Sequence, residues 1–392
     1  MHPSPAAALL AELVRIDSRS PGRLGDPRSD GAPTEEALAR FLSAHLEQLG
    51  MTVELQWLEP GRPHLVARSP QIPGAPTLAF EAHLDTVGVE GMTIPPFTPE
   101  LRGGRLYGRG ACDTKGPMAA MLVALEKLLH DTQHATRNAG RSPLNLLFIG
   151  CCAEETGCEG VKHLKINGLR PDAVIVGEPT ENRPVIGHKA HLWFELSVRG
   201  KAAHGSHPEA GDNAIYRMAD VIASLRRFAG TRLLEASHPG FTPATLSVGT
   251  IRGGTKVNIV PDSCAVLVDV RLLPQQTPAA MLEELAAWVR ADSGQPVEIT
   301  WKAMAPGFAS RADSALVRAF AAAGDARGAR MPPGVVNYCT DAGSFGEAGY
   351  DTVVFGPGSI LQAHAAEEYI ELAQLDAAVQ ILMETARQYA RC

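Results

Sequence analysis

The chain has 392 residues, of which 45% are hydrophobic and 20% charged, and its formal net charge is −7; these values are typical of a globular protein with about two domains. The basic residues are scattered, so the sequence gives no sign of a nucleic-acid partner. No apolar run approaches the length that crosses a membrane, and residues 6–14, which include Glu12 and follow no basic leader, predict an amphipathic helix and not a signal peptide.

The cysteines predict a reducing environment. Seven of them, at positions 112, 151, 152, 158, 264, 339 and 392, form no paired C-x-x-C modules. An odd number without such spacing is typical of reduced thiols in a cytoplasmic protein. Cys151 and Cys152 extend an apolar run, so we expect them to be small core residues.

The first part of the chain predicts two helices followed by strands. Residues 5–16 and 33–49 have helical apolar spacing, and the segment between them is rich in Pro, Gly and Arg and predicts a loop. Residues 51–58 and 64–68 predict strands. The next apolar run, 78–80, leads into His83 and Asp85. If this strand continues through both residues, their side chains lie on one face, because side chains alternate along a strand.

Three further apolar runs predict strands that are buried on both faces. They are residues 144–150, 172–177 and 352–356. Helical runs such as 118–129 lie between several of the strands, and the polar segment 130–143 predicts an exposed loop. This order predicts an α/β fold in which helices cover a mostly parallel sheet.

Potential metal ligands lie near the ends of these strands. The residues are His83, Asp113, Glu154, Glu155, Glu178 and His364. All but Asp113, which precedes the helix at 118–129, follow a strand. Taken alone, His83 could be a core histidine and Asp113 a helix cap. Because sites in open α/β sheets form outside the carboxyl ends of the strands, their shared placement favours one metal site.

Between residues 184 and 303 the pattern changes to strand, helix, strand, strand, helix, strand. We expect the strands at 189–199, 244–251, 263–272 and 297–303, and the helices at 213–229 and 278–293. This order predicts a small α+β domain of the split βαβ type. The first pattern resumes after residue 304, so residues 1–183 and 304–392 should form a discontinuous metal-binding domain with 184–303 inserted into it.

The ligand set favours two ions. Two histidines and three carboxylates, without cysteine, suit zinc, cobalt or manganese. The set exceeds the needs of one four-coordinate ion with an open position, whereas two ions that share a bridging carboxylate would use all of it. Two ions together polarise a carbonyl and lower the pKa of a water. Glu154 and Glu155 could supply one ligand and one base, although an isolated Glu-Glu pair is usually a solvated surface.

Six motifs occur in the order and approximate spacing of the M20 metallopeptidase/amidohydrolase family, which the chain resembles over nearly its full length. They are HLDTV (83–87), GRGACDTKG (108–116), AEETGCEG (153–160), GEPT (177–180), GKAAHGSHPEAGDNAI (200–215) and QAH (362–364). Three stretches are most similar to the acetylornithine deacetylase group of that family: RPVIGHKAH (183–191), NYCTDAGSF (337–345) and GPGSILQAHAAEEY (356–369). The loop at 19–33, Thr114 and Pro117 depart from the pattern and leave the substrate open.

The resemblance implies a catalytic domain with an inserted lid domain that also forms a homodimer. It implies two divalent ions, Zn²⁺ or alternatively Co²⁺. One would be held by His83 and Glu178, the other by Glu155 and His364, and Asp113 would bridge them.

The resemblance also implies roles for residues around the ions. Asp85 would orient His83, and Glu154 would be the general base that takes a proton from the attacking water and passes it to the leaving amine. His204 would reach the active site of the partner subunit and stabilise the developing oxyanion. The alternative for His204 is an exposed loop histidine.

Three further residues are candidates for substrate binding. Asn258 and Arg271 could hold polar groups of the substrate, and Arg271 could grip an α-carboxylate bidentately. The alternative for Arg271 is a structural ion pair on its strand. Thr340 is a candidate for the pocket wall.

The implied activity is removal of an N-acyl group from a small-molecule N-acyl amino acid, with N²-acetyl-L-ornithine of arginine biosynthesis favoured. N-succinyl-diaminopimelate desuccinylase, N-acetylcitrulline deacetylase, aminoacylase and dipeptidase activities remain alternatives. Acidic residues near the side-chain end of the pocket would favour ornithine, and an additional arginine would favour a succinyl group. A catalytically silent scaffold would be expected to lack Glu154 or a ligand, and all of these residues are present.

Overall fold

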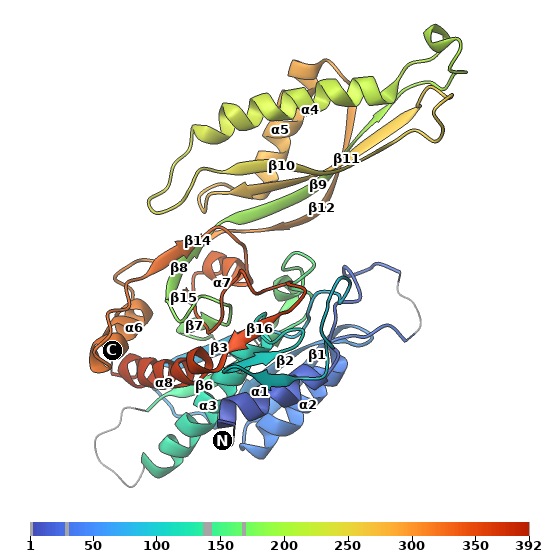
Figure 1. Cartoon of the computed structure of the whole chain (residues 1–392). Helices are drawn as coiled ribbons and strands as arrows, with labels where there is room; N and C mark the ends of the chain where they lie inside the picture. The colour runs from blue at the N-terminus through green and yellow to red at the C-terminus, as the bar shows by residue number, and fades with distance from the viewer. Residues whose placement is uncertain (1–2, 28–30, 136–142, 167–169, 392) are drawn as a thin grey trace. The chain divides into compact units, whose positions relative to one another are not determined.

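The computed structural model describes residues 3–27, 31–135, 143–166 and 170–391. The chain divides into two compact units (Figure 1). Met1–Gly187, Ala309–Gly334 and Thr340–Cys392 form the first unit, and His188–Phe308 with Val335–Cys339 form the second.

The larger sheet has nine strands within the described residues, in the order β1-β2-β6-β3-β7-β15-β8-β13, with β14 paired to β8. They are β1 (Thr52–Glu59), β2 (Arg62–Arg68), β3 (Thr77–His83), β6 (Asn145–Cys151), β7 (Ala173–Val176), β8 (Val185–His188), β13 (Phe308–Ala309), β14 (Gly334–Val336) and β15 (Asp351–Val354). The neighbours β6, β3, β7 and β15 run parallel, whereas β1, β2 and β8 pair antiparallel. The mostly parallel α/β sheet is confirmed.

Helices cover this sheet. They are α1 (Pro5–Arg15), α2 (Glu36–Gln48), α3 (Lys115–Ala135), α6 (Ala315–Ala326), α7 (Ala342–Glu347) and α8 (Leu372–Tyr389). Residues 118–125 of α3 are all buried, because this helix contacts β3 as well as α1 and α8. The apolar core therefore fixes the start of α3, which directly follows the Asp113 loop.

A three-stranded sheet lies next to the same loop. It consists of β4 (Glu100–Arg102), β5 (Arg105–Tyr107) and β16 (Tyr369–Glu371), in the order β16-β5-β4. Pairing of β16 with β5 brings the segment after His364 beside the GRGACDTKG motif.

The second unit is built on a four-stranded antiparallel sheet, in the order β10-β11-β9-β12. Its elements are β9 (Ala190–Arg199), α4 (Ala214–Gly230), β10 (Thr245–Gly253), β11 (Ser263–Leu272), α5 (Pro278–Ser293) and β12 (Val297–Ala305). The helices α4 and α5 contact each other and the sheet, and their apolar faces form a separate core with β9 and β11.

Strand β3 ends at His83, where its pairing with β6 also ends at Cys151, so the condition under which Asp85 would share a strand face with His83 is not met. One local prediction was wrong. The predicted loop at 130–143 begins later, since α3 extends to Ala135 where neither Gly nor Pro interrupts it. Residues 136–142 of that prediction lie outside the described residues.

None of the helices in the described part of the chain has a stretch long and apolar enough to span a bilayer. Cys151 and Cys152 are fully buried core residues, as predicted.

Candidate metal centre

Two groups of potential ligands share one carboxylate. His83, Asp113 and Glu178 each offer a ligand atom, and these atoms lie within 4.8 Å of one another. Asp113 also belongs to a second such group, with Glu155 and His364. The structure therefore brings together all five predicted ligands, with Asp113 common to both groups.

The carboxylate of Asp113 directs one oxygen to each histidine. Its Oδ1 lies 2.9 Å from His83 Nε2, and its Oδ2 lies 3.3 Å from His364 Nε2. His83 Nε2 is 3.9 Å from Glu178 Oε1, and His364 Nε2 is 3.1 Å from Glu155 Oε2. This is the arrangement that a bridging carboxylate between two sites requires.

Glu368 holds the Asp113 loop in place. The main-chain N–H groups of Cys112 and Asp113 donate to Glu368 Oε1 at 2.9 and 3.0 Å, and Gly110 N–H donates to Oε2 at 3.0 Å. Arg109 Nη1 donates to the same oxygen at 2.6 Å. Sequence reasoning missed Glu368; its position between the candidate ligand His364 and strand β16 is the signal that could have found it.

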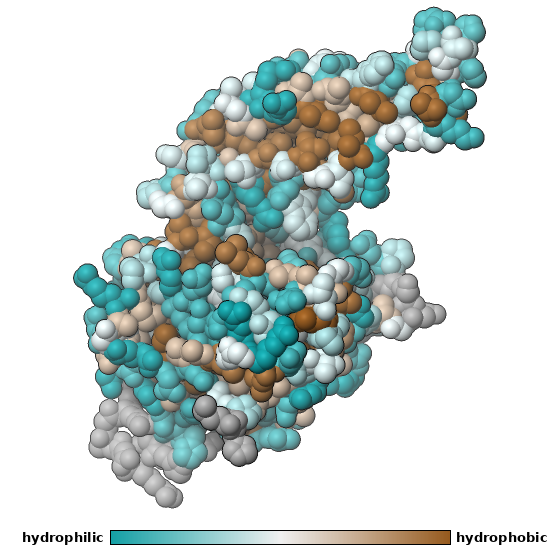
Figure 2. Space-filling model, viewed as in Figure 1, coloured by the Kyte–Doolittle hydropathy of each residue, from teal (hydrophilic) through white to brown (hydrophobic). Residues whose placement is uncertain are grey.

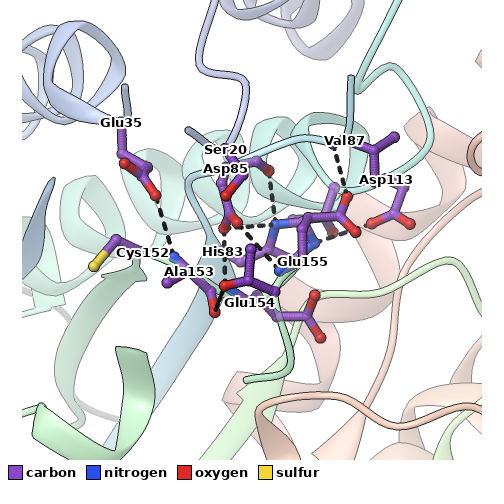
Figure 3. A network of polar contacts seen from close by, with 12 residues as sticks. Ser20, Glu35, His83, Asp85, Val87, Asp113, Cys152, Ala153, Glu154 and Glu155 are labelled. Atoms are coloured by element: carbon purple, nitrogen blue, oxygen red, sulfur yellow. Dashed lines mark hydrogen bonds and ion pairs between the residues drawn. The ribbon is translucent and has the colours of Figure 1, made fainter. Parts of the chain in front are cut away.

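Asp85 contacts both His83 and the Glu154–Glu155 pair (Figure 3). Its carboxylate accepts the main-chain N–H of Glu154 at 3.0 Å and that of Glu155 at 3.1 Å. The contact with His83 Nδ1 is made by the carbonyl oxygen of Asp85 at 2.9 Å, while its nearest carboxylate oxygen is 3.7 Å away. Asp85 thus positions His83 through its main-chain carbonyl, and its side chain holds the loop that carries Glu154 and Glu155.

Glu154 belongs to neither histidine group. Its Oε1 accepts the thiol S–H of Cys158 at 3.3 Å, and Asp341 lies within 4.8 Å of both. Burial raises the pKa of Glu154 well above that of an ordinary glutamate, and the charge of Asp341 raises it further. The adjacent Glu155, in contrast, contacts His364, so the two neighbours point to different partners.

The ionisable groups of the site perturb one another strongly. Burial, followed by the charge of Asp113, raises the pKa of Glu155 to about 7 and that of Glu178 well above its usual range. Hydrogen bonds to Asp113 and Glu155 raise the pKa of His364 to about 10. Burial works against the charged form of Asp113, but its two histidine partners hold its pKa below the ordinary value. The carboxylates repel one another, and bound cations would relieve this repulsion.

The residues fit divalent metal ions. The donors are two imidazole nitrogens and three carboxylates, a set that suits zinc, cobalt or manganese. Asp113 and Glu178 are buried, and one carboxylate is shared between both groups, as expected of a two-ion site.

The second unit places His204 next to Asn258. Gly205 N–H donates to Asn258 O at 2.8 Å, and His204 forms a bridge with Ile259. The His204 side chain is exposed, and its Nδ1 lies 2.8 Å from Ser206 Oγ.

The other two candidates have structural partners. Arg271, on β11, pairs with Asp269 at 3.0 Å, which is the alternative role considered for it. Thr340 is buried in the first unit, where its Oγ1 accepts Ala342 N–H at 3.1 Å at the start of α7.

The chain is similar to known proteins over most of its length. The model of peptidase family M20/M25/M40 matches residues 79–388. An acetylornithine deacetylase from Myxococcus xanthus is 34% identical over 381 residues, which cover 94% of this chain and 93% of that protein.

Solved structures share the fold. An M20 family metallo-carboxypeptidase from Sulfolobus solfataricus has a TM-score of 0.82 at 21% identity, covering 99% of both chains. A dinuclear metal-binding peptidase of the M20 family from Bacillus subtilis has a TM-score of 0.69 at 16% identity, covering 97% of this chain and 96% of that one. Because the family model and a relative above 30% identity both span most of the chain, the protein belongs to the M20 family of metal-dependent hydrolases.

Proposed function

We propose that the protein removes the acetyl group from N²-acetyl-L-ornithine and releases L-ornithine and acetate. The observation that carries the proposal is a pair of ligand groups sharing Asp113, next to the buried and separately held Glu154. The specific substrate is supported by the 34% identity to the Myxococcus xanthus protein of that name.

Two divalent ions, zinc or cobalt, would occupy the two ligand groups. His83 and Glu178 would hold one ion, Glu155 and His364 the other, and Asp113 both. When bound, the ions would polarise the acyl carbonyl and lower the pKa of the attacking water.

Glu154 is the general base in this proposal. It takes a proton from the attacking water and delivers it to the leaving amine. A buried carboxyl group with a raised pKa is suited to both steps near neutral pH. It takes a proton from the water more readily than an ordinary glutamate does, and it can then pass that proton to the amine. Asp85 fixes the main chain of Glu154 and so keeps the base in position.

Four further residues would act on the substrate: His204, Asn258 and Arg271 from the second unit and Thr340 from the first. His204 would stabilise the oxyanion in a partner subunit, and the other three would bind polar groups of the substrate. Arg271 would have to leave Asp269 or use the remaining donors of its guanidinium.

A homodimer is supported by apolar side chains that are exposed on the second unit. Tyr216 on α4, Ile251 on β10 and Trp301 on β12 are all exposed, and β10 and β12 are the edge strands of their sheet. Figure 2 shows apolar side chains gathered on the surface of this unit. Exposed apolar side chains and open strand edges are features of interaction surfaces. The cytoplasmic location stays a prediction.

A substrate panel tests the proposal. Amine release would be measured from N²-acetylornithine, N-acetylcitrulline, N-succinyl-diaminopimelate and N-acetylmethionine, using chelator-treated protein with and without added Zn²⁺ or Co²⁺. We expect metal-dependent turnover concentrated on N²-acetylornithine. Preference for another member of the panel would refute this substrate while retaining the chemistry, and absence of turnover on all of them would refute the deacylase proposal.

A further inference from the structure

Glu35 and Arg62 form an ion pair that is fully buried beside the proposed active site. Arg62 Nη2 lies 2.7 Å from Glu35 Oε1, and the side chains of both residues are 0% exposed. Arg62 Nε adds contacts of 3.1 Å to both oxygens of Glu35. A pair of this kind is costly to desolvate, so its burial calls for a reason beyond stability.

Glu35 also accepts a hydrogen bond from the loop that carries Glu154 and Glu155. Its Oε1 accepts the main-chain N–H of Ala153 at 3.2 Å (Figure 3). Ala153 has a φ of 60°, a left-handed conformation that a residue with a Cβ adopts only when its surroundings hold it there. The next two N–H groups, of Glu154 and Glu155, are held by Asp85. Two buried carboxylates thus hold three consecutive main-chain amides.

Residues 18–24 connect this ion pair to the other end of the loop. Arg62 Nη1 donates to Gly22 O at 2.7 Å. The next residue, Arg23, donates through Nε to Glu159 Oε1 at 3.0 Å, and Leu24 N–H donates to Glu159 Oε2 at 3.2 Å. The loop that carries the base is therefore held at Ala153 and at Glu159.

The same segment also holds the loop that follows His83. Ser20 N–H donates to Thr86 O at 2.8 Å, and Thr86 N–H donates to Ser18 O at 3.1 Å. The residue after Thr86, Val87, donates its N–H to Glu155 Oε1 at 3.2 Å. Residues 18–24 thus join two loops that approach the centre from neighbouring strands.

We propose that residues 18–24, together with Glu35 and Arg62, form a clamp that positions the Ala153–Glu159 loop for catalysis. Glu35 is the principal positioning residue, and it acts through the main chain of Ala153. The clamp gives a role to part of the 19–33 loop, which departs from the family pattern. All residues of the clamp precede residue 79, where the match to the family model begins. The effect of the clamp on catalysis rests on the proposed function, in which Glu154 is the general base.

Two double variants isolate the contact between Glu35 and Ala153. E35Q/R62M removes both buried charges but keeps an oxygen that can accept the Ala153 N–H, whereas E35M/R62M removes the charges and the acceptor. Hydrogen–deuterium exchange would be followed by mass spectrometry in peptides covering residues 151–160, and kcat and KM would be measured on the best substrate of the panel. R387M, which breaks the Asp131 ion pair between α8 and α3, is the control.

We expect amides 153–155 to exchange about tenfold faster in E35M/R62M than in E35Q/R62M, because the loop opens more often. Its kcat should be about 10- to 100-fold lower, with KM within about twofold, since the base is displaced while the substrate contacts remain. E159Q, which weakens the contact with Arg23, should cause a smaller change in the same direction, and R387M should cause none.

Equal exchange and equal kcat in the two double variants would overturn the clamp. If the parent protein hydrolyses no member of the panel, the proposed function fails, but the exchange comparison still decides whether Glu35 holds the loop. If turnover is present and the exchange rates are equal, only the clamp is refuted.

Discussion

Replacing Glu154 by Gln removes the proposed base while preserving its shape. The side-chain oxygen of Gln can still accept the Cys158 thiol, which lies 3.3 Å from Glu154 Oε1. The contact with Asp85 uses the main-chain N–H and is unaffected. Burial and the nearby Asp341 disfavour a charge at this position, so a neutral amide loses little favourable electrostatic energy. We therefore expect the free energy of unfolding to change by less than about 1 kcal/mol.

The effect on catalysis should be much larger. A positioned general base contributes about 10²- to 10⁴-fold to a rate, which corresponds to about 3–5 kcal/mol at 1.36 kcal/mol for each tenfold change. We expect kcat to fall by this factor. KM and bound metal should change little, because Glu154 belongs to neither histidine group.

The assay is steady-state amine release by E154Q, with metal content measured on the same sample. E155Q is the matched control, since the neighbouring carboxylate contacts His364 and should affect metal retention. A kcat for E154Q within about threefold of the parent value would refute its role as the base. Loss of metal from E154Q but not from E155Q would show that the two roles are reversed.

Three further predictions concern the bridging ligand, the lid histidine and the acid limit of stability. D113N should reduce the metal retained after dialysis from two ions to at most one, because both ligand groups contain Asp113; retention of two ions, measured by elemental analysis, would contradict a bridging role. H204A should lower kcat by about 10²-fold while leaving metal content unchanged, and an unchanged kcat would remove His204 from the mechanism. Burial lowers the pKa of His64 to about 4, from 6.5 in the unfolded chain, so this histidine stabilises the fold above pH 6.5 and its contribution is lost as the pH falls to about 4. Urea unfolding would be measured at pH 7 and at pH 4.5. H64Q should lose less stability on acidification than the parent, by roughly 2 kcal/mol, whereas equal losses in H64Q and the parent would contradict this linkage.

Elements with a clear periodicity could be predicted closely from the sequence. Strand β11 and helix α5 have the predicted bounds, 263–272 and 278–293, because inward and outward side chains alternate along the strand and a proline starts the helix. The parallel core could be predicted because β3, β6, β7 and β15 are apolar on both faces. Four of the five candidate ligands could be predicted because each follows such a strand, and Asp113 because it precedes the helix that became α3.

Residues that act through tertiary contacts could not be predicted in this way. Glu35 meets Ala153 across 118 positions of sequence, and Glu368 meets Asp113 across 255. Neither contact leaves a periodic signal, since it depends on how the loops fold back on the sheet. Asp85 illustrates the same limit: its proximity to His83 was expected from strand alternation, but β3 ends first and a loop directs the carboxylate to the Glu154–Glu155 amides.

The proposed function requires two ions, held by these five residues, for the hydrolysis of an N-acyl amino acid. The most direct measurement is a titration of chelator-stripped protein with Zn²⁺ or Co²⁺, in which bound metal and amine release from N²-acetylornithine are determined on the same samples. We predict that activity rises with bound metal and reaches its maximum at two ions per chain. Full activity in the stripped protein, or two bound ions without hydrolysis of any N-acyl amino acid, would contradict the claim.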